Sequence, residues 1–234
     1  MKLRNWKNSV KAIIFDLDDT IYEETKFVES GFRAVSSYAE KQLGIGKKKF
    51  FGALKNSLEK DGRGHTFDIV LKNYNCYNKG LVNKLVRIYR THKPKIKPSP
   101  GVMTTLQILK NKFLLGIITD GMGSVQRNKV KSLNIEKLFD LIVYSDDLGK
   151  DNYKPNKYPY EKMLKQLGVS AKEAIYVGDN PYKDFIGAKK IGFKTIRVLK
   201  GQYKNIKIDK DHEADCSIKK INELLELLGN LTDK

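Results

Sequence analysis

One short stretch near the N-terminus constrains the fold more than any other part of the chain. Residues 12–15 are apolar, and they run directly into three acids, Asp16, Asp18 and Asp19. A short, continuous hydrophobic run is typical of a strand buried in a parallel sheet. Ionised carboxylates are costly to bury unless a cation compensates them. The stretch therefore predicts a buried strand with a ligand site at its carboxyl end, although a solvated turn that caps a helix is the alternative.

The next part of the chain, from Ile21 to about Lys97, has a different periodicity. Its apolar residues recur at helical spacing in four successive stripes, and no strand-like alternation interrupts them. Glycines follow the first two stripes, as is typical where helices end. We expect residues 21–97 to form a small helical bundle that is inserted directly after the acidic strand.

After Gly101 the pattern alternates regularly between helix and strand. We expect strands at residues 113–118, 139–144, 174–177 and 193–198, in addition to the first strand at 11–15. We expect helices at residues 102–109, 124–133 (capped by Ser124), 158–167, 181–190 and 218–228. This alternation predicts the α/β class, with a Rossmann-like parallel sheet as the core. The core would comprise residues 1–20 and 98–234.

Polar residues follow several of the expected strands. They are Asp16 and Asp18, Thr119, the pair Asp146 and Asp147, and Asp179, and a Lys154-Pro155 pair lies beyond another strand. The carboxyl ends of parallel strands meet along one edge of a doubly wound sheet. The two cysteines and three histidines are isolated from one another in the sequence. Any metal should therefore be held by oxygen atoms, as Mg²⁺ is, and should not be zinc.

These residues also resemble a known family. Asp16-Leu17-Asp18-Asp19-Thr20, Thr119, Lys154-Pro155 and the segment Gly178–Asp184 are similar, in this order, to the four motifs of the haloacid dehalogenase-like (HAD) hydrolase superfamily. The expected helical insert resembles the type-1 cap domain of that superfamily. Residues 89–94, 119–121 and 178–181 further resemble the phosphatase-like members that carry such a cap.

The resemblance implies roles for the acidic residues. Asp16 would be the nucleophile that forms an aspartyl-phosphate. Asp18 would be the general acid and then the general base, and its backbone carbonyl would reach the metal. Asp16 and Asp179 would hold Mg²⁺, with Asp184 as a ligand through water or as a support for the site. Read alone, Asp184 is equally explained as an acid in the first turn of a helix.

Three further residues would bind the phosphate. Thr119 would donate a hydrogen bond to a phosphoryl oxygen, and Lys154 would neutralise charge on Asp16 and on the phosphate. Backbone N–H groups near Leu17, Asp18 and Asp120 would add donors. Without the family pattern, Thr119 is an ordinary hydroxyl at a strand end, and Lys154 is one lysine in a lysine-rich chain. We expect neither Asp146 nor Asp147 to be a ligand, although Asp147 could orient Lys154.

Asp18 separates two chemistries within the superfamily. The dehalogenases that resemble this chain lack an acid at this position, since no alkoxide leaves. Asp18 therefore favours phosphate esters over carbon–halogen bonds. Asp19 replaces a commoner glycine, as it does in many capped phosphatases. Six residues are candidates for recognising the leaving group of the substrate: Tyr22, Glu23, Lys26, Arg63, His65 and Lys72. Each of them is equally explained as part of a solvated helical face.

The positive net charge of the chain is also compatible with functions other than that of a small-molecule phosphatase. Lys and Arg number 45 against 27 Asp and Glu, a net charge of +18, which is suited to anionic partners. Because long blocks of like charge are absent, we expect the lysines to serve solubility and do not expect a nucleic-acid partner. A small site enclosed by the cap would favour a small phosphorylated substrate. The alternatives are a phosphomutase, a nucleic-acid-binding protein and a phosphatase of nucleic-acid 3′ ends. Neither a secretory signal nor a membrane helix is recognisable, which predicts a cytoplasmic protein with no membrane partner. We expect it to be a monomer or a homodimer.

Overall fold

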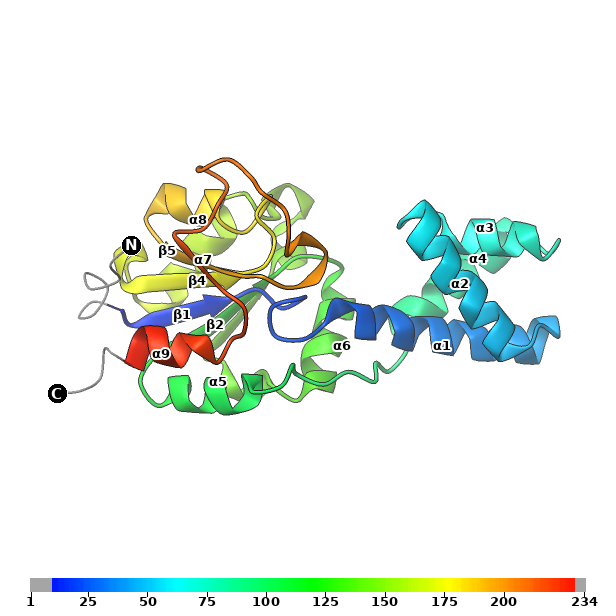
Figure 1. The fold of residues 1–234 in the computed structure, drawn as a ribbon, viewed down its shortest axis with the longest axis horizontal. Coiled ribbons are helices and arrows are strands. Elements are labelled where there is room, and N and C mark those ends of the chain that lie inside the picture. The colour runs from blue at the N-terminus through cyan, green and yellow to red at the C-terminus, as the bar shows by residue number, and fades with distance from the viewer. Residues whose placement is uncertain (1–9, 230–234) are drawn as a thin grey trace. The chain divides into compact units, whose positions relative to one another are not determined.

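The computed structural model describes residues 10–229, and a parallel six-stranded sheet forms its core (Figure 1). The strand order is β3-β2-β1-β4-β5-β6, and each neighbouring pair is parallel. The strands are β1 (Ala12–Phe15), β2 (Leu114–Thr119), β3 (Leu141–Tyr144), β4 (Ala174–Gly178), β5 (Lys194–Val198) and β6 (Cys216–Ile218). The predicted α/β class with a Rossmann-like core is confirmed. β1 lies centrally, between β2 and β4, where the direction of strand addition reverses and α/β sheets bind ligands.

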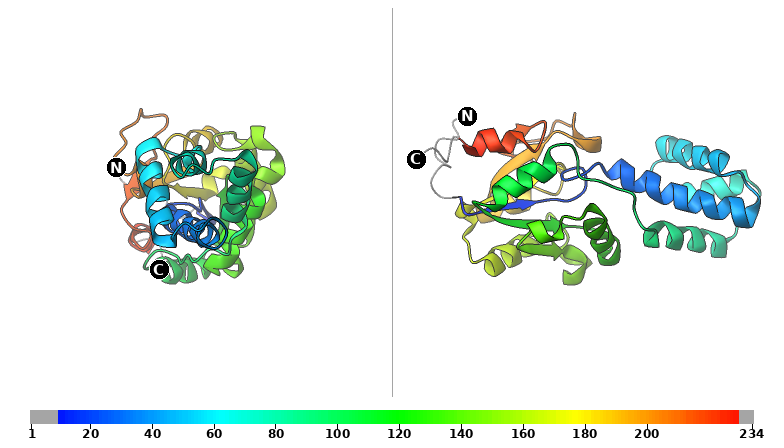
Figure 2. Two further views of the ribbon diagram at one scale, coloured as in Figure 1. Left: turned by 90° about the vertical axis from the view of Figure 1, so that its right-hand side faces the viewer. Right: turned by 90° about the horizontal axis from the view of Figure 1, so that it is seen from below.

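Helices cover both faces of the sheet (Figure 2). α5 (Val102–Lys110) and α9 (Glu223–Gly229) contact each other on one face, and α7 (Tyr158–Leu167) and α8 (Ile186–Ile191) contact each other on the opposite face. Ala12 and Ile14 of β1 pack into the cluster that includes Tyr160 and Met163 of α7. α6 (Gly123–Leu133) follows β2. Short 3₁₀ helices occur at Glu136–Leu138, Ser145–Leu148, Lys150–Asn152, Ala171–Glu173 and Gly201–Tyr203.

Three local predictions about this core are wrong. The helix predicted at 218–228 begins only at Glu223, as α9, because its first predicted residue, Ile218, is the last residue of the short strand β6. The helix predicted at 181–190 begins at Ile186, because the chain before it forms a turn in which the Asp184 N–H donates to the Asn180 carbonyl. Ser124 does not cap α6, which begins one residue earlier and has no side-chain cap.

The inserted segment is entirely helical. It consists of α1 (Glu24–Leu43), α2 (Lys47–Asp61), α3 (Thr66–Asn73) and α4 (Lys79–Thr91). Buried apolar side chains from all four helices form one cluster, which includes Phe32, Leu54, Val70 and Leu85. No helix between residues 10 and 229 combines the length and the apolar character that a membrane span requires.

The chain divides into two compact units, one running up to Glu24 and from Lys97 onward, the other covering Thr25–Ile96. The predicted boundaries were after residues 20 and 97, so the first lies four residues later in the structure. The turn after the acidic motif belongs to the sheet unit because Ile21 and Tyr22 are buried, and the Ile21 carbonyl accepts a hydrogen bond from the Ser99 N–H.

Candidate active site

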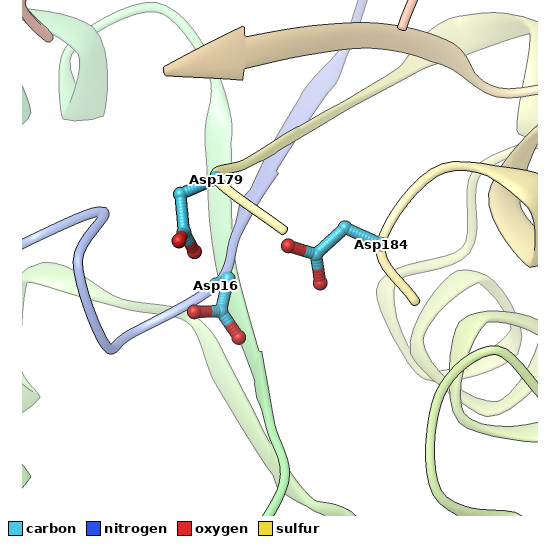
Figure 3. A group of neighbouring side chains, drawn as sticks. All are labelled: Asp16, Asp179 and Asp184. Atoms are coloured by element: carbon cyan, nitrogen blue, oxygen red, sulfur yellow. The ribbon is translucent and has the colours of Figure 1, made fainter. Parts of the chain in front are cut away.

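Three carboxylates from separate parts of the sheet unit meet at the carboxyl edge of the sheet. Asp16 follows β1, Asp179 follows β4, and Asp184 lies in the turn before α8. Figure 3 shows the three side chains turned toward a common space. Each offers an oxygen within 4.8 Å of the other two, and all three residues are buried. Gly178 allows this approach, because a Cβ atom there would lie 2.5 Å from the Asp184 Oδ2 atom.

Lys154 supplies the positive charge beside these acids. Its Nζ atom donates to an oxygen of Asp16, to Asp184 Oδ1 at 2.8 Å and to the Tyr176 hydroxyl at 2.9 Å. Burial would lower the pKa of Lys154, but the charges of Asp16 and Asp184 outweigh it and raise that pKa well above its ordinary value. The side chain is fully buried. The structure therefore brings Lys154 to Asp16, as the sequence predicts.

The prediction that Asp147 could orient Lys154 is wrong. Asp147 forms an ion pair with Arg127 of α6, and both side chains are about half exposed. The groups that hold the Lys154 ammonium are instead Asp16, Asp184, Tyr176 and the Ile118 carbonyl. The Asp146 carboxylate does not hold Lys154 either, since it accepts hydrogen bonds from the Gly123 N–H and the Tyr153 hydroxyl.

The acids outnumber the ammonium groups that touch them. Burial, together with the charge of Asp184, raises the pKa of Asp16 to about 7 in spite of Lys154. Burial and the charges of Asp184 and Asp16 raise the pKa of Asp179 to about 9. Raised pKa values show that full ionisation is unfavourable here without further positive charge. The cluster offers only carboxylate oxygens, which suit a hard divalent cation.

Asp18 has different surroundings, although it lies two residues after Asp16. Its two oxygens accept hydrogen bonds from Lys129 Nζ at 2.8 and 2.9 Å, and also from Gln126 Nε2 and the Tyr22 hydroxyl. Burial would raise the pKa of Asp18, but Lys129 and these hydrogen bonds lower it below its ordinary value. The Asp18 carboxylate is not part of the three-acid group, and the metal contact of its backbone carbonyl stays a prediction.

Two of the predicted phosphate-binding residues, Thr119 and Asp120, lie at the end of β2. Thr119 is buried, and its hydroxyl accepts a hydrogen bond of 2.5 Å from Gln126 Nε2. The Asp120 carboxylate accepts a hydrogen bond from the Lys154 backbone N–H at 3.3 Å, and it lies 3.6 Å from Lys183 Nζ. The role of the backbone N–H groups near Leu17, Asp18 and Asp120 in binding phosphate stays a prediction.

The turn after Asp18 explains two features of the motif. Asp19 has a φ of 52°, in the left-handed region where glycine is common and where Asp is tolerated. Its Oδ1 atom accepts a hydrogen bond from the Glu24 N–H at the start of α1. Tyr22, a candidate for reading the leaving group, is buried and donates its hydroxyl hydrogen bond to Asp18. Its position is therefore explained by the turn itself.

Sequence reasoning missed four residues of this region. Gln126 and Lys129 contact Asp18, Tyr176 contacts Lys154, and Lys183 lies beside Asp120. A signal for the first two exists in the sequence, because positions 126, 129, 130 and 133 share one face of a helix at spacings of three and four. Lysines are so common in this chain that Lys129 alone did not stand out.

Comparison with known proteins shows the family of the chain. The family model described as "Haloacid dehalogenase-like hydrolase" matches residues 13–198. The chain belongs to this family. A HAD relative named glyceraldehyde 3-phosphate phosphatase, from Methanocaldococcus jannaschii, is 34% identical over 228 residues, covering 95% of this chain and 98% of the relative. A pyrophosphatase from Bacillus pumilus is 27% identical, covering 95% of this chain and 98% of that protein.

Solved structures of HAD proteins share the fold. The HAD-hydrolase YfnB from Bacillus subtilis, described as bound to magnesium, aligns with a TM-score of 0.67. The alignment covers 94% of this chain and 99% of that chain, at 20% sequence identity. At this identity the likeness establishes the α/β fold of the HAD family, while the chemistry has to be argued from the site itself.

Proposed function

We propose that this HAD hydrolase is a Mg²⁺-dependent phosphatase that hydrolyses a phosphate monoester of a small metabolite through an aspartyl-phosphate. The observation that supports this proposal best is the combination of Asp16, held by Lys154 in the buried three-acid cluster, with a second acid at Asp18. Asp18 is the residue that a departing alkoxide requires and a departing halide does not. The names of the relatives, which are phosphatases, point the same way.

In the first step, a carboxylate oxygen of Asp16 attacks phosphorus, and the bond between phosphorus and the ester oxygen breaks. The departing alkoxide takes a proton from Asp18, so that an alcohol and an aspartyl-phosphate result. Lys154 favours the ionised form of Asp16 and directs its carboxylate, and Thr119 donates a hydrogen bond to a phosphoryl oxygen. The substrate dianion would otherwise repel the acids of the site.

In the second step, Asp18 removes a proton from a water molecule as the water attacks phosphorus. The bond between phosphorus and Asp16 then breaks, which releases inorganic phosphate and regenerates the Asp16 carboxylate. Asp18 ends this step protonated. Because Lys129 lowers its pKa in spite of burial, Asp18 has to keep this proton, or regain one from solvent, before the next alkoxide departs. The two steps together consume one water molecule for each ester bond.

Asp16, Asp179 and Asp184 would hold the Mg²⁺ ion, Asp184 either directly or through water. Bound there, Mg²⁺ would offset the negative charge of the acids and of the substrate phosphate. The raised pKa values of Asp16 and Asp179 support this assignment, because these carboxylates are short of positive charge. The arrangement contains neither the thiolate nor the imidazole ligands that zinc sites favour.

The substrate should be a small phosphorylated molecule, and the name of the first relative makes glyceraldehyde 3-phosphate, a phosphate monoester, the first candidate. The name of the pyrophosphatase makes inorganic pyrophosphate a second candidate, in which the departing group is phosphate and not an alkoxide. We assign the selection of the leaving group to the helical insert, which the family resemblance makes the cap domain. The phosphomutase alternative predicts an isomerised sugar phosphate as product. The alternative of a phosphatase for nucleic-acid ends predicts a preference for oligonucleotide 3′-phosphates.

The decisive experiment measures phosphate release from a panel that contains these two compounds, other sugar phosphates, nucleotides and an oligonucleotide 3′-phosphate. The wild type should release phosphate only with Mg²⁺ and should form no isomerised sugar phosphate. Asp16→Asn should abolish release, whereas Asp151→Asn, a change of an exposed acid, should not. Full activity of Asp16→Asn would refute the mechanism. Inertness of the wild type together with salt-sensitive binding to nucleic acid would favour a binding protein.

A further inference from the structure

Helix α6 carries two polar side chains that the sheet unit buries. Gln126 is 2% exposed and Lys129 is 4% exposed. The two positions are three residues apart and therefore share one face of the helix. Burying an ammonium group is costly unless a partner compensates it. The position of Lys129 therefore requires an explanation from its contacts.

Lys129 places its ammonium across both oxygens of Asp18, at 2.8 and 2.9 Å. Gln126 donates to Asp18 Oδ2 at 3.0 Å, and Tyr22 donates to Oδ1. A carboxylate held by three donors on different sides cannot rotate freely about its side-chain torsions. The direction of the proposed general acid is thus fixed by two donors from α6 together with Tyr22 from the turn that follows Asp18.

Gln126 also contacts the second active group. Its Nε2 atom donates a hydrogen bond of 2.5 Å to the Thr119 hydroxyl oxygen, and this is the hydrogen bond that the described residues provide for that hydroxyl. A hydroxyl carries a single proton for donation. Because Thr119 acts as an acceptor toward Gln126, its own O–H remains to be donated to a phosphoryl oxygen. One amide group therefore orients both Asp18 and Thr119.

We propose that Gln126 and Lys129 are positioning residues of the active site, which orient Asp18 for proton transfer to the leaving group and Thr119 for binding of the phosphate. This inference rests on the proposed phosphatase function and adds two residues to it. Neither residue needs to touch the substrate, since each acts through a residue that does. Their effects should therefore depend on which step of the reaction the oriented residue serves.

The test for Lys129 compares two substrates that differ in leaving group. Lys129→Met should lower kcat/KM about 10²-fold for an alkyl phosphate, the scale of a general acid. It should lower kcat/KM for 4-nitrophenyl phosphate far less, because that leaving group departs without a proton. The ratio of the two values does not depend on how much of the variant is folded. Lys131→Met, which changes an exposed lysine on the same helix, should leave the ratio unchanged.

A double mutant separates positioning from a general structural role. If Lys129 acts through Asp18, adding Lys129→Met to Asp18→Asn should cost little further activity on the alkyl phosphate. An unchanged ratio in the single variant, or a further large loss in the double variant, would overturn the proposal for Lys129. Higher activity of Lys129→Met would also overturn it, by showing that the lysine restrains Asp18. Lys129→Gln provides the same comparison should Lys129→Met fail to fold.

Gln126→Met should give a different kinetic signature. Because Thr119 binds the phosphate in both substrates, this variant should raise KM for both, and it should weaken inhibition by inorganic phosphate about tenfold. Unchanged KM and unchanged phosphate inhibition would refute the role of Gln126. The proposed function fails separately, if the wild type is inactive or if Asp16→Asn retains activity. The positioning roles fail when wild type and Asp16→Asn behave as expected and these variants behave as the wild type.

Discussion

Two buried lysines, Lys154 and Lys129, neutralise carboxylates that lie two residues apart in the sequence, and their surroundings differ in charge. Lys154 lies between Asp16 and Asp184, with Asp179 close by, so acids outnumber the ammonium. Lys129 pairs with Asp18, whose remaining partners are the neutral Gln126 and Tyr22. The first region needs a further cation, whereas the second is already balanced. In the proposed function, metal binding and orientation of the general acid would therefore be separate tasks of neighbouring residues.

The largest expected difference between the two regions concerns Mg²⁺. Asp179→Asn should weaken Mg²⁺ binding by about 100-fold or more, because it removes a ligand, and the effect of a ligand should exceed that of a supporting residue. Asp18→Asn should change Mg²⁺ affinity only slightly, since the Asp18 carboxylate is outside the three-acid group. Calorimetric titration of both variants with Mg²⁺ measures the difference. Equal weakening by the two variants would contradict the proposed separation.

The two lysines should also differ in their contribution to stability. Lys154→Met leaves buried carboxylates without their cation, which should lower the free energy of unfolding by about 3–5 kcal/mol. Lys129→Met should cost less, because the Asp18 side chain is 22% exposed and keeps Gln126 and Tyr22 as donors. Urea unfolding in EDTA measures both values. Addition of Mg²⁺ should recover part of the loss for Lys154→Met and little of the loss for Lys129→Met.

The cluster of Asp16, Asp179 and Asp184 predicts that the stability of the metal-free protein depends on pH. The pKa of Asp179 is raised to about 9, above its ordinary value of 3.8. A raised folded-state pKa gives stability that is present at low pH and is lost as pH rises through the folded pKa. The melting temperature in EDTA should therefore fall between pH 7 and pH 9. The lowered pKa of His92 acts in the opposite direction, but only below its ordinary value of 6.5.

Two variants isolate this effect. Asp179→Asn should flatten the fall in melting temperature between pH 7 and pH 9, and saturating Mg²⁺ should flatten it in the wild type. Asp18→Asn should keep the fall, since a lowered pKa affects stability only on the acidic side of the range. A melting temperature that is constant or rises between pH 7 and pH 9 in EDTA would show that Asp179 is ionised at little cost.

The smallest expected effect concerns the acid that was predicted to orient Lys154. Asp147→Asn breaks an ion pair with Arg127 in which both side chains are about half exposed. Such pairs contribute about 0–1 kcal/mol. The variant should keep kcat within about twofold, because the partners of Lys154 are unaffected. A loss comparable to that of Lys154→Met would reinstate Asp147 as a support of the site.

Much of the fold could be predicted from the sequence because the spacing of apolar residues is regular along whole helices and strands. The run at residues 12–15, followed by Asp16, predicted a buried strand with a polar carboxyl end. β6 was missed because it has only three residues, Cys216–Ile218, and forms by pairing with β5. The start of α8 was missed because Asp184 lies in a turn that brings its carboxylate to Lys154. In both cases a partner distant in the sequence decided the local structure.

By itself, the sequence determined the α/β core, the helical insert and the order of Asp16, Asp18, Thr119, Lys154 and Asp179 along the chain. Hydrophobic period and strand-end chemistry are local properties, so a single sequence displays them. Only the tertiary structure decided that Gln126 and Lys129 hold Asp18, from positions 108 and 111 residues away. A buried polar contact depends on which surfaces pack together. The helical spacing places Lys129 on the same face as the apolar residues of α6, but it does not show which acid the lysine pairs with.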